Sequence, residues 1–322
     1  MKKVDIAIIG AGLSGCIAAN QLPSSKFTRM IIEKSRGVGG RCSRRQTKEG
    51  MNIDLGLPSF SEKQTHLLNA VFKQKGILPW QYKQYTENDG VKLNNQWVAA
   101  PSMNQAHREL IQGIPLLRST RIQRITESNQ QFILFDDENQ AVVKATQVIV
   151  TAPALQTQAL LSTLNIQDAQ IEHAAEGSYP QFVIVLNIPN EVMPYSIYYG
   201  QHPVIEKIIA EHHKPGRENT QGATYTIHTT PAWSKQFQDM DIKEVSIQVK
   251  EAFENLFSCK GQATCISSHR WLLAGHEIKS QKNAYLSFLD NRVHVCADWL
   301  VDDNITGAIK SSTQLVESIK AL

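Results

Sequence analysis

The chain has 322 residues, more than the roughly 150 of a typical single domain, so we expect two closely joined units. Apolar residues make up 42% and charged residues 20%, which is the composition of an ordinary folded protein. The formal net charge is only +3, and this argues against a surface built to bind nucleic acid or an anionic membrane.

The cysteine pattern and the N-terminal segment both indicate the cellular compartment in which we expect the protein. The five cysteines are odd in number and form no Cys-x-x-Cys pair, which indicates free thiols in a reducing cytoplasm. They are Cys16, Cys42, Cys259, Cys265 and Cys296. The apolar run Val4–Ala19 is interrupted by Asp5 and three glycines, so a strand, turn and helix explain it better than a signal peptide. No later segment approaches the roughly 20 apolar residues of a membrane span, and we expect a cytoplasmic protein.

The first 45 residues alternate between strand and helix signals. An apolar strand, Val4–Ile9, leads into a glycine turn, Gly10–Gly15, and then into a helix, Cys16–Leu22. A second strand, Met30–Glu33, completes a βαβ unit of about 30 residues, the length that a parallel crossover needs. A loop rich in glycine and arginine, Arg36–Arg45, follows.

Further elements are predicted along the rest of the chain. Gln64–Lys75 is predicted as a helix, because Leu67, Leu68, Val71 and Phe72 fall on one face. The middle of the chain adds a short helix, a hairpin and a strand: Met103–Leu110, Gln131–Phe135 with Ala141–Lys144, and Gln147–Thr151. The later strands are Gln181–Ile188, Ala223–Thr229 and Val293–Ala297, and the later helices are Glu244–Phe257 and Thr306–Ala321.

The strongest motif is the string Gly10-Ala11-Gly12-Leu13-Ser14-Gly15 between the first strand and helix. Gly10 permits the tight turn, Gly12 lets the backbone approach a pyrophosphate, and Gly15 lets the helix pack against the strand. Glu33 ends the next strand, where a carboxylate can accept hydrogen bonds from a ribose 2′-hydroxyl and would repel a 2′-phosphate. The segment predicts a Rossmann-like site for the ADP half of NAD or FAD.

A second glycine turn follows Glu33 and distinguishes between NAD and FAD as the expected cofactor. Its sequence is Lys34-Ser35-Arg36-Gly37-Val38-Gly39-Gly40-Arg41. Its glycines allow a ligand to approach the backbone, and Arg36 and Arg41 can meet anionic oxygens. A plain NAD dehydrogenase normally has no such turn after the ribose acid. The turn therefore favours FAD, which we expect to be bound non-covalently.

With this turn the sequence resembles the amine-oxidase-type FAD superfamily, and in particular its renalase branch and the bacterial relatives of that branch. Five further segments resemble elements of the branch: Asp54–Phe60, Trp97–Met103, Thr151–Pro153, His269–Trp271 with Ala274, and Cys296–Leu300 with Gly307 and Ala308. The chain departs from the branch at Leu57-Pro58, at Ser102, at Ala297 and at Ser311-Ser312, and it lacks a Tyr after Trp271.

The motifs and the resemblance together imply a set of site residues. Asp298 ends an apolar strand just before a helix, so its carboxylate can accept from ribityl hydroxyls while the helix start faces the flavin. The predicted cofactor-binding residues are Gly10, Gly12, Leu13, Ser14, Gly15, Glu33, Lys34, Arg36, Gly40, Arg41, Thr151, Ala152, Pro153, Asp298, Trp299, Gly307 and Ala308. The predicted substrate-pocket residues are His269, Arg270 and Trp271, since an indole can wall a planar ring and a guanidinium can hold an anion.

Other chemistries find less support in the sequence. His202, His212 and His213 are interpreted as surface histidines, because no partner stands at metal-ligand spacing, and no metal is expected. No Gly-x-Ser-x-Gly motif is present, which argues against a hydrolase.

The expected fold class is α/β: an FAD-binding Rossmann-like domain with an inserted α+β substrate domain that contains a mixed or antiparallel sheet. Residues 1–75, about 145–160 and 288–322 are assigned to the FAD-binding domain. Residues of about 76–144 and 161–287 are assigned to the substrate domain.

The resemblance implies an FAD-dependent oxidase that converts the 2- and 6-dihydro isomers of NAD(P)H to NAD(P)+. Only one dinucleotide fingerprint is visible, so molecular oxygen is the expected electron acceptor, giving hydrogen peroxide. The alternatives are a flavin amine oxidase acting on a small amine, an FAD-dependent desaturase or isomerase, and a non-catalytic FAD-binding scaffold.

Overall fold

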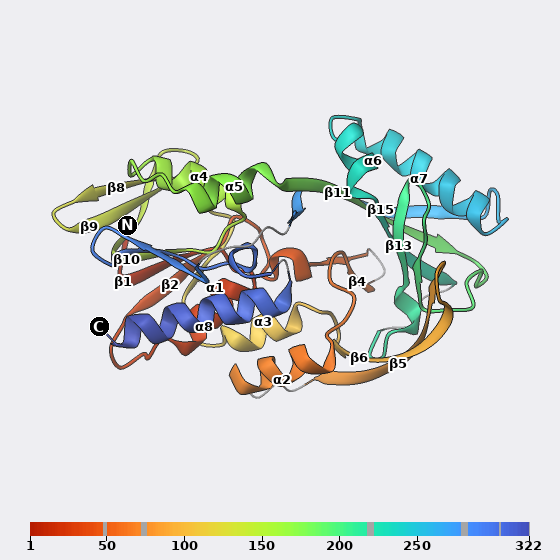
Figure 1. Ribbon diagram of the computed structural model, residues 1–322, viewed down its shortest axis with the longest axis horizontal. Coiled ribbons are helices and arrows are strands. Elements are labelled where there is room, and N and C mark those ends of the chain that lie inside the picture. Colours follow the sequence, from red (N-terminus) through yellow and green to blue (C-terminus); the bar gives the residue numbers. More distant parts are fainter. Residues whose placement is uncertain (48–49, 72–75, 218–221, 278–282, 303, 322) are drawn as a thin grey trace.

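A computed structural model describes residues 1–47, 50–71, 76–217, 222–277, 283–302 and 304–321. Two large sheets lie side by side, and both chain ends lie in the part that contains the first sheet (Figure 1). This arrangement confirms the expected fold class, a Rossmann-like α/β unit joined to a unit with a second, mixed sheet. None of the helices in the described ranges is both long and apolar enough to cross a membrane.

The first sheet is built around parallel strands. Its order is β16-β17-β10-β1-β2-β7, and β1 runs parallel to both β10 and β2. The bounds are β1 Lys2–Ile9, β2 Arg29–Ile32, β7 Leu116–Leu117, β10 Ala141–Val150, β16 Leu286–Phe288 and β17 Val293–Val295. The hairpin of β8 (Ile122–Ser128) and β9 (Gln131–Asp136) joins through β10. The central parallel strands end in buried apolar runs, Ile6–Ile9 in β1 and Val148–Val150 in β10, where the sheet is covered on both faces.

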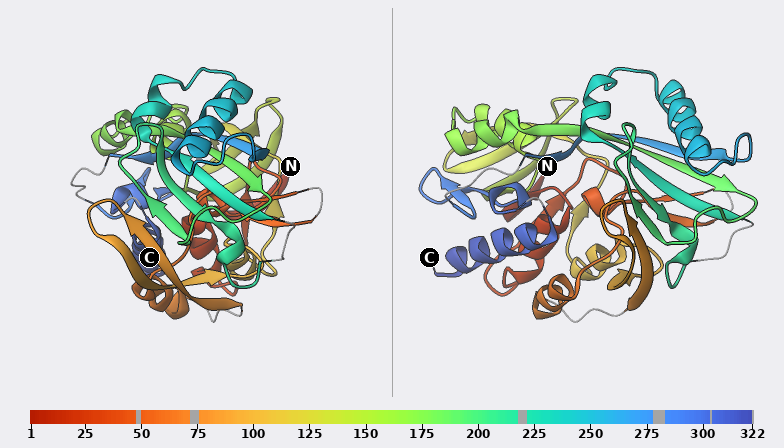
Figure 2. Two further views of the ribbon diagram at one scale, coloured as in Figure 1. Left: turned by 90° about the vertical axis from the view of Figure 1, so that its right-hand side faces the viewer. Right: turned by 45° about the vertical axis from the view of Figure 1, so that its right-hand side comes forward.

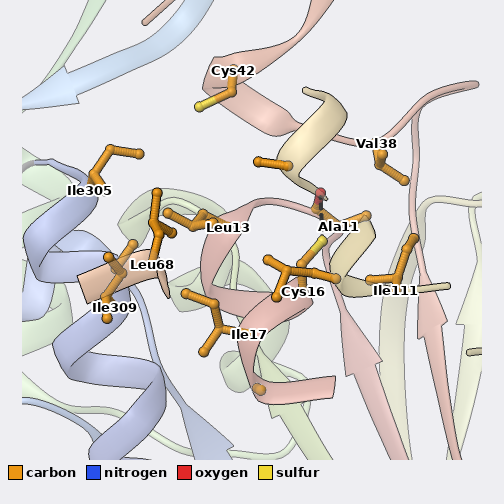
Figure 3. Close-up of a cluster of buried hydrophobic side chains, with 14 of the residues drawn as sticks. Ala11, Leu13, Cys16, Ile17, Val38, Cys42, Leu68, Ile111, Ile305 and Ile309 are labelled. Carbon is orange, nitrogen blue, oxygen red and sulfur yellow. Dashed lines mark hydrogen bonds between the residues drawn. The ribbon is translucent and has the colours of Figure 1, made fainter. Parts of the chain in front are cut away.

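Helices cover one face of this sheet, and helices with the hairpin cover the other. The first face carries α1 Leu13–Gln21, α2 Glu62–Val71, α3 Gln105–Leu110 and α8 Ile305–Ala321. Figure 3 shows Leu13 and Ile17 of α1 packed towards Leu68, Ile305 and Ile309 from α2 and α8. The opposite face is covered by α4 Ala154–Ser162, α5 Ala169–Glu176 and the β8–β9 hairpin.

The second sheet stands beside the first, with two helices on its outer face (Figure 2). Its order is β15-β11-β14-β13-β12-β5-β6, and among the described strands only the β12–β5 pair is parallel. The bounds are β5 Ile77–Thr86, β6 Gly90–Ala99, β11 Ser178–Ile188, β12 Ile197–Tyr199, β13 Ile205–Ala210, β14 Ala223–Thr229 and β15 Thr264–His276. The outer helices are α6 Pro231–Gln236 and α7 Ile242–Leu256. The inner face meets the ribbon of β3 Arg44–Gln46 and β4 Asn52–Asp54.

Sheet membership corrects part of the assignment made from the sequence. Strands β7, β8 and β9 and the start of β10 lie within 76–144, which was assigned to the substrate domain, but they belong to the first sheet. Helix α5 and the end of α4 also pack against the first sheet rather than the second. Local patterns identify a strand or helix, whereas the sheet that it joins depends on distant pairing. Phe72–Lys75 of the predicted helix lie outside the described residues.

Candidate active site

The glycine turn between β1 and α1 has the geometry of a phosphate cradle. Gly10 has φ +110°, and a Cβ on Gly15 would lie 2.1 Å from the carbonyl oxygen of Gly10, so both positions exclude a side chain. A Cβ on Gly12 would meet nothing within 4 Å. Helix α1 begins after Gly12 with no side-chain cap and no acidic residue in its first turn. The first N–H groups of α1 and the open space beside Gly12 fit an anionic phosphate group.

Glu33 holds this turn from the end of β2. Its Oε2 accepts the N–H of Ala11 at 2.8 Å, and its Oε1 accepts the N–H of Ser35 at 2.8 Å. The residue is 7% exposed, so the carboxylate is fixed between the two glycine turns. Each carboxylate oxygen has a further lone pair, with which Glu33 can accept a ribose hydroxyl.

The second glycine turn folds back onto the first. Gly39 has φ +125°, which favours glycine, and donates its N–H to the carbonyl oxygen of Ala11 at 2.9 Å. A Cβ on Gly40 would lie 3.3 Å from Cα of Gly12, so the two turns are in close contact. The two turns thus present one backbone-lined surface, of the kind that an extended dinucleotide requires. Lys34 and Arg36 are exposed at its edge.

Three distant segments meet beside the glycine turn. Thr151, which follows β10, donates its hydroxyl to the carbonyl oxygen of Ile9 at 2.9 Å. Trp299 lies in the short helix η3, Asp298–Leu300, and donates its indole N–H to the carbonyl oxygen of Ala152 at 3.0 Å. The predicted residues after β10 and β17 are therefore joined to each other and to the end of β1.

Arg41 and Asp298, two predicted cofactor contacts, form an ion pair with each other. Arg41 lies in the short helix η1, Gly40–Cys42, so this pair connects the second glycine turn to η3. A Cβ on Gly307 would lie 2.8 Å from the carbonyl oxygen of Asp298, which places the start of α8 directly against η3. The structure thus gathers the predicted cofactor residues of η1, η3 and α8 around one location.

The predicted substrate residues do not all share one face. His269 and Trp271 lie on the inner face of β15, where their rings contact edge to face with centroids 4.3 Å apart. Arg270 lies on the opposite face, where its guanidinium donates to the carbonyl oxygen of Met240 and lies 5.3 Å from the Phe182 ring. Strand alternation separates neighbours in this way, so Arg270 is a packing residue of the outer face.

The surroundings of the His269 ring favour its neutral form. Burial, followed by the positive charge of Arg45, lowers the pKa of His269. A neutral imidazole beside an indole presents a weakly polar, flat surface on the inner face of the sheet.

Sequence reasoning missed a polar cluster on the same inner face. Gln181 Nε2 donates to Glu206 Oε2 at 2.6 Å and to the carbonyl oxygen of Thr229 at 2.9 Å. Its Oε1 must therefore accept, and His228 Nδ1 lies 3.1 Å from it as the donor. His228 Nε2 is then a buried acceptor without a hydrogen-bond partner among the described residues. Lys207 stands opposite His228 in the β13–β14 ladder.

Burial and neighbouring charges shift the pKa values of two members of this cluster. Burial, with smaller contributions from Lys207 and Lys214, lowers the pKa of His228 well below its usual value. Burial likewise lowers the pKa of Lys207, although Glu206 opposes the shift. The alternation of β14, in which Thr224, Thr226 and His228 face inward, is the sequence signal that could have identified this face.

Asp54 anchors the segment that resembles the Asp54–Phe60 element. It is 2% exposed, and its Oδ2 lies 3.1 Å from Lys214 Nζ and 2.5 Å from Arg217 Nη2. Burial opposes ionisation of Asp54, but these two cations lower its pKa overall. Two residues later, a Cβ on Gly56 would lie 1.8 Å from the carbonyl oxygen of Arg41. The ion pairs fix this segment to Lys214 and Arg217, and the backbone at Gly56 packs directly against the helix that carries Arg41.

Comparisons with known proteins agree with this geometry. The family model of the NAD(P)-binding Rossmann-like domain matches residues 8–74. The chain is 43% identical over 51 residues to a zeta-carotene-forming phytoene desaturase of Myxococcus xanthus, a stretch covering 16% of this chain and 10% of that protein. It is 34% identical over 89 residues to a flavin-containing amine oxidase of Danio rerio, covering 28% of this chain and 16% of that protein. The matches thus span less than a fifth of these relatives.

Solved structures match over nearly the whole chain at low sequence identity. A protein assigned as a protoporphyrinogen oxidase from Exiguobacterium sp. 255-15 has a TM-score of 0.76 at 10% identity, covering 99% of both chains. Putrescine oxidase bound to putrescine has a TM-score of 0.68 at 10% identity, again covering 99% of both chains. Cyclohexylamine oxidase from Brevibacterium oxydans IH-35A has a TM-score of 0.68 at 12% identity, covering 98% of this chain and 99% of the other.

The fold is that of the amine-oxidase-type flavoproteins. The relatives matched in sequence include a desaturase and a flavin-containing amine oxidase.

Proposed function

We propose that this chain is an FAD-dependent oxidase that binds FAD non-covalently and oxidises the 2- and 6-dihydro isomers of NAD(P)H. In the overall reaction a dihydro isomer, oxygen and one proton give NAD(P)+ and hydrogen peroxide. Bound FAD supplies hydride acceptance and the transfer of two electrons to oxygen. The five free cysteines, four of them buried, support a cytoplasmic location for the reaction.

The cofactor half of this proposal rests on the paired glycine turns. The open space at Gly12, the uncapped start of α1 and the fixed carboxylate of Glu33 suit a pyrophosphate and its ribose. The second turn and the Arg41–Asp298 pair extend this surface beyond what an ADP group alone needs. This extra length favours a cofactor with a further ring system, as in FAD.

The proposed substrate rests on the side chains that line the inner face of the second sheet. The His269–Trp271 ring pair lies on this face, and Gln181 stands opposite Trp271 in the β11–β15 ladder. A flat aromatic surface beside a carboxamide suits a ring that carries its own carboxamide, as nicotinamide does. Lys207, nearby on the same face, supplies a cation for the phosphates of the substrate.

These residues would select between isomers by position. A ring held by its carboxamide presents one of its carbons to the cofactor, and a displacement of about 1 Å can cost on the order of 100-fold in rate. Ordinary NAD(P)H carries its hydride at the 4-position, so it is expected to react slowly in a site that presents the 2- or 6-carbon.

A small amine is the second candidate substrate. The likeness to putrescine oxidase and the match to a flavin-containing amine oxidase favour it, as does the Glu206 carboxylate on the inner face. The neighbouring Lys207 weakens this reading, because a cation disfavours binding of a protonated amine.

The test is anaerobic mixing of the purified holoprotein with each 2-, 4- and 6-dihydro isomer and with a panel of primary amines. We expect rapid loss of flavin absorbance with the 2- or 6-isomers, at least 100-fold slower loss with the 4-isomer, and peroxide on admission of oxygen. Heat denaturation of the same preparation should release free FAD. Rapid bleaching by an amine alone would move the protein to the second candidate, and release of FMN would contradict the cofactor proposal.

A variant pair tests the substrate face directly. Trp271→Ala should slow bleaching by the 2- or 6-isomer by 10-fold or more while the FAD content stays at the wild-type level. Leu272→Ala is the matched control, because Leu272 follows on the same strand and is 65% exposed. Equal bleaching rates in the two variants would remove the inner face from the substrate site.

A further inference from the structure

Glu191, His212 and His213 converge at a place that the proposed oxidase site does not use. Glu191 lies in the loop between β11 and β12, and the histidines lie in the short helix η2, Glu211–His213, between β13 and β14. One side-chain donor atom of each residue lies within 4.8 Å of the other two. His213 Nε2 is 2.6 Å from Glu191 Oε1, and His212 Nε2 is 3.9 Å from the same oxygen.

Both imidazole rings are oriented through their other nitrogen. His213 Nδ1 lies 2.9 Å from the hydroxyl of Ser196, and His212 Nδ1 lies 3.1 Å from the carbonyl oxygen of Thr224. The N–H of Thr224 also lies 3.1 Å from His212 Nδ1. In the tautomer in which Nδ1 donates to the Thr224 carbonyl oxygen and to the Ser196 hydroxyl, each Nε2 is unprotonated and faces Glu191. This is the arrangement in which proteins present histidine to a metal ion.

An ion pair alone does not account for all three residues. The His213–Glu191 contact satisfies one ring, but His212 Nε2 is a buried atom without a hydrogen-bond partner among the described residues. A buried polar atom in this state has lost its hydration without compensation. A shared cation would engage this nitrogen together with the other two donors.

We propose that Glu191, His212 and His213 bind a divalent transition-metal ion, for which Zn²⁺ is the best fit. Two imidazoles and one carboxylate are a set of borderline donors that suits Zn²⁺ better than Mg²⁺ or Ca²⁺. Three protein ligands leave one tetrahedral position for water.

The observed separations fit this proposal. Metal–ligand distances of about 2.0–2.2 Å place tetrahedral donor atoms about 3.4 Å apart. The present separations of 2.6 and 3.9 Å from Glu191 Oε1 bracket that value. Glu191 has a 48% exposed side chain, so a change of its rotamer can equalise the two distances.

The ion would join two loops of the second sheet. Glu211 and Lys214 flank the two histidines and lie in the buried ion-pair network with Asp54. A metal that fixes η2 to the loop of Glu191 therefore stabilises a segment whose other side holds Asp54 in place. This role is independent of the substrate that the oxidase site accepts.

The test is a Zn²⁺ titration of metal-stripped full-length holoprotein in competition with a chromophoric chelator. We expect one tight site per chain, weakened at least 10-fold in Glu191→Gln and in His213→Asn. His66→Ala is the matched control, because His66 also faces a glutamate, Glu62, at 3.8 Å but has no second histidine in the group. The absence of a tight site in the wild type, or equal affinity in all variants, would overturn the proposal.

A second measurement uses only the wild-type protein, so its result does not depend on whether the variants fold. X-ray absorption at the zinc edge of the one-to-one complex should show only nitrogen and oxygen neighbours, including two imidazoles. A sulfur neighbour would place the metal at a cysteine and would equally overturn the assignment.

Discussion

The Glu33 carboxylate accepts hydrogen bonds from both glycine turns. One oxygen fixes Ala11 in the first glycine turn, and the other fixes Ser35 in the second. Both contacts lie within the protein, so they are present before a cofactor binds. The remaining lone pairs can then meet a ribose at little entropic cost, because the acceptor is already in position.

Replacing this carboxylate should therefore weaken FAD binding more than it weakens the fold. For Glu33→Ala we expect the dissociation constant of FAD to rise roughly 5- to 150-fold, equivalent to about 1–3 kcal/mol for lost hydrogen bonds to a charged group. Flavin fluorescence quenching on the apoprotein measures this constant. Lys26→Ala, at an exposed position before β2 and outside both glycine turns, serves as the control. Wild-type affinity in Glu33→Ala would place the ribose elsewhere.

His269, Arg270 and Trp271 are adjacent in the sequence but do not share one face of their strand. The three were predicted together as substrate residues, but a strand sends alternate side chains to opposite faces, and Arg270 packs on the outer side. Assigning this segment to a strand would have been enough to separate them. The Gln181–His228 contact could not be predicted in this way, because it joins two strands 47 residues apart.

At the scale of elements, the sequence predicted best where contacts are local. The βαβ unit of β1, α1 and β2 was expected within a few residues of its observed bounds, because the glycine turn, the apolar strands and the ribose acid lie within 33 residues. The β5–β6 hairpin and the β12–β13 pair were missed. β12 has only three residues, too few for a pattern. β5 and β6 pair with each other along their whole length, so their hairpin is local, but the many polar residues of both strands weakened its signal.

The glycines of the first turn allow packing and ligand binding to be separated by experiment. Gly15→Ala would place a Cβ 2.1 Å from the carbonyl oxygen of Gly10, so α1 must move away from β1. We expect this variant to lose about 1–3 kcal/mol of unfolding free energy as well as FAD binding. Gly12→Ala meets nothing within 4 Å, so the apoprotein should keep its stability while FAD binding falls, because the methyl group occupies the phosphate space.

Urea denaturation of the two apoproteins and FAD titration of each distinguish these effects. Gly37→Ala is the matched control, since a Cβ there meets nothing within 4 Å and the residue lies in the exposed part of the second turn. If Gly12→Ala binds FAD as the wild type does, the phosphates do not approach this turn, and the cofactor proposal loses its main support.

At the scale of the whole molecule, buried histidines in both parts of the fold should make its stability sensitive to acid. His107 in α3 is completely buried, and neither ring nitrogen has a hydrogen-bond partner among the described residues. His294 in β17 is 1% exposed. Burial lowers the pKa of each histidine to about 4, and His228 in the second sheet is shifted in the same direction. All three rings are therefore neutral in the folded protein at neutral pH.

The sign of the pH effect follows from these depressed pKa values. An unfolded chain has histidine pKa values of about 6.5, so below that pH the unfolded state binds protons that the folded state cannot. The stabilising contribution is complete above pH 6.5 and is lost as the pH falls through the folded pKa of about 4. Each of His107 and His294 should therefore remove about 2 kcal/mol between pH 7 and pH 5.

The histidine contribution can be isolated by removing one ring. His107→Leu keeps an apolar side chain in the same buried place, so its unfolding free energy should fall by about 2 kcal/mol less than the wild type between pH 7 and pH 5. Urea denaturation at both pH values, with FAD in excess, measures the difference. His173→Leu, at an exposed position of α5, should retain the full wild-type loss. An identical loss in His107→Leu and the wild type would show that the acid sensitivity arises from other groups, such as the buried carboxylates around Lys214.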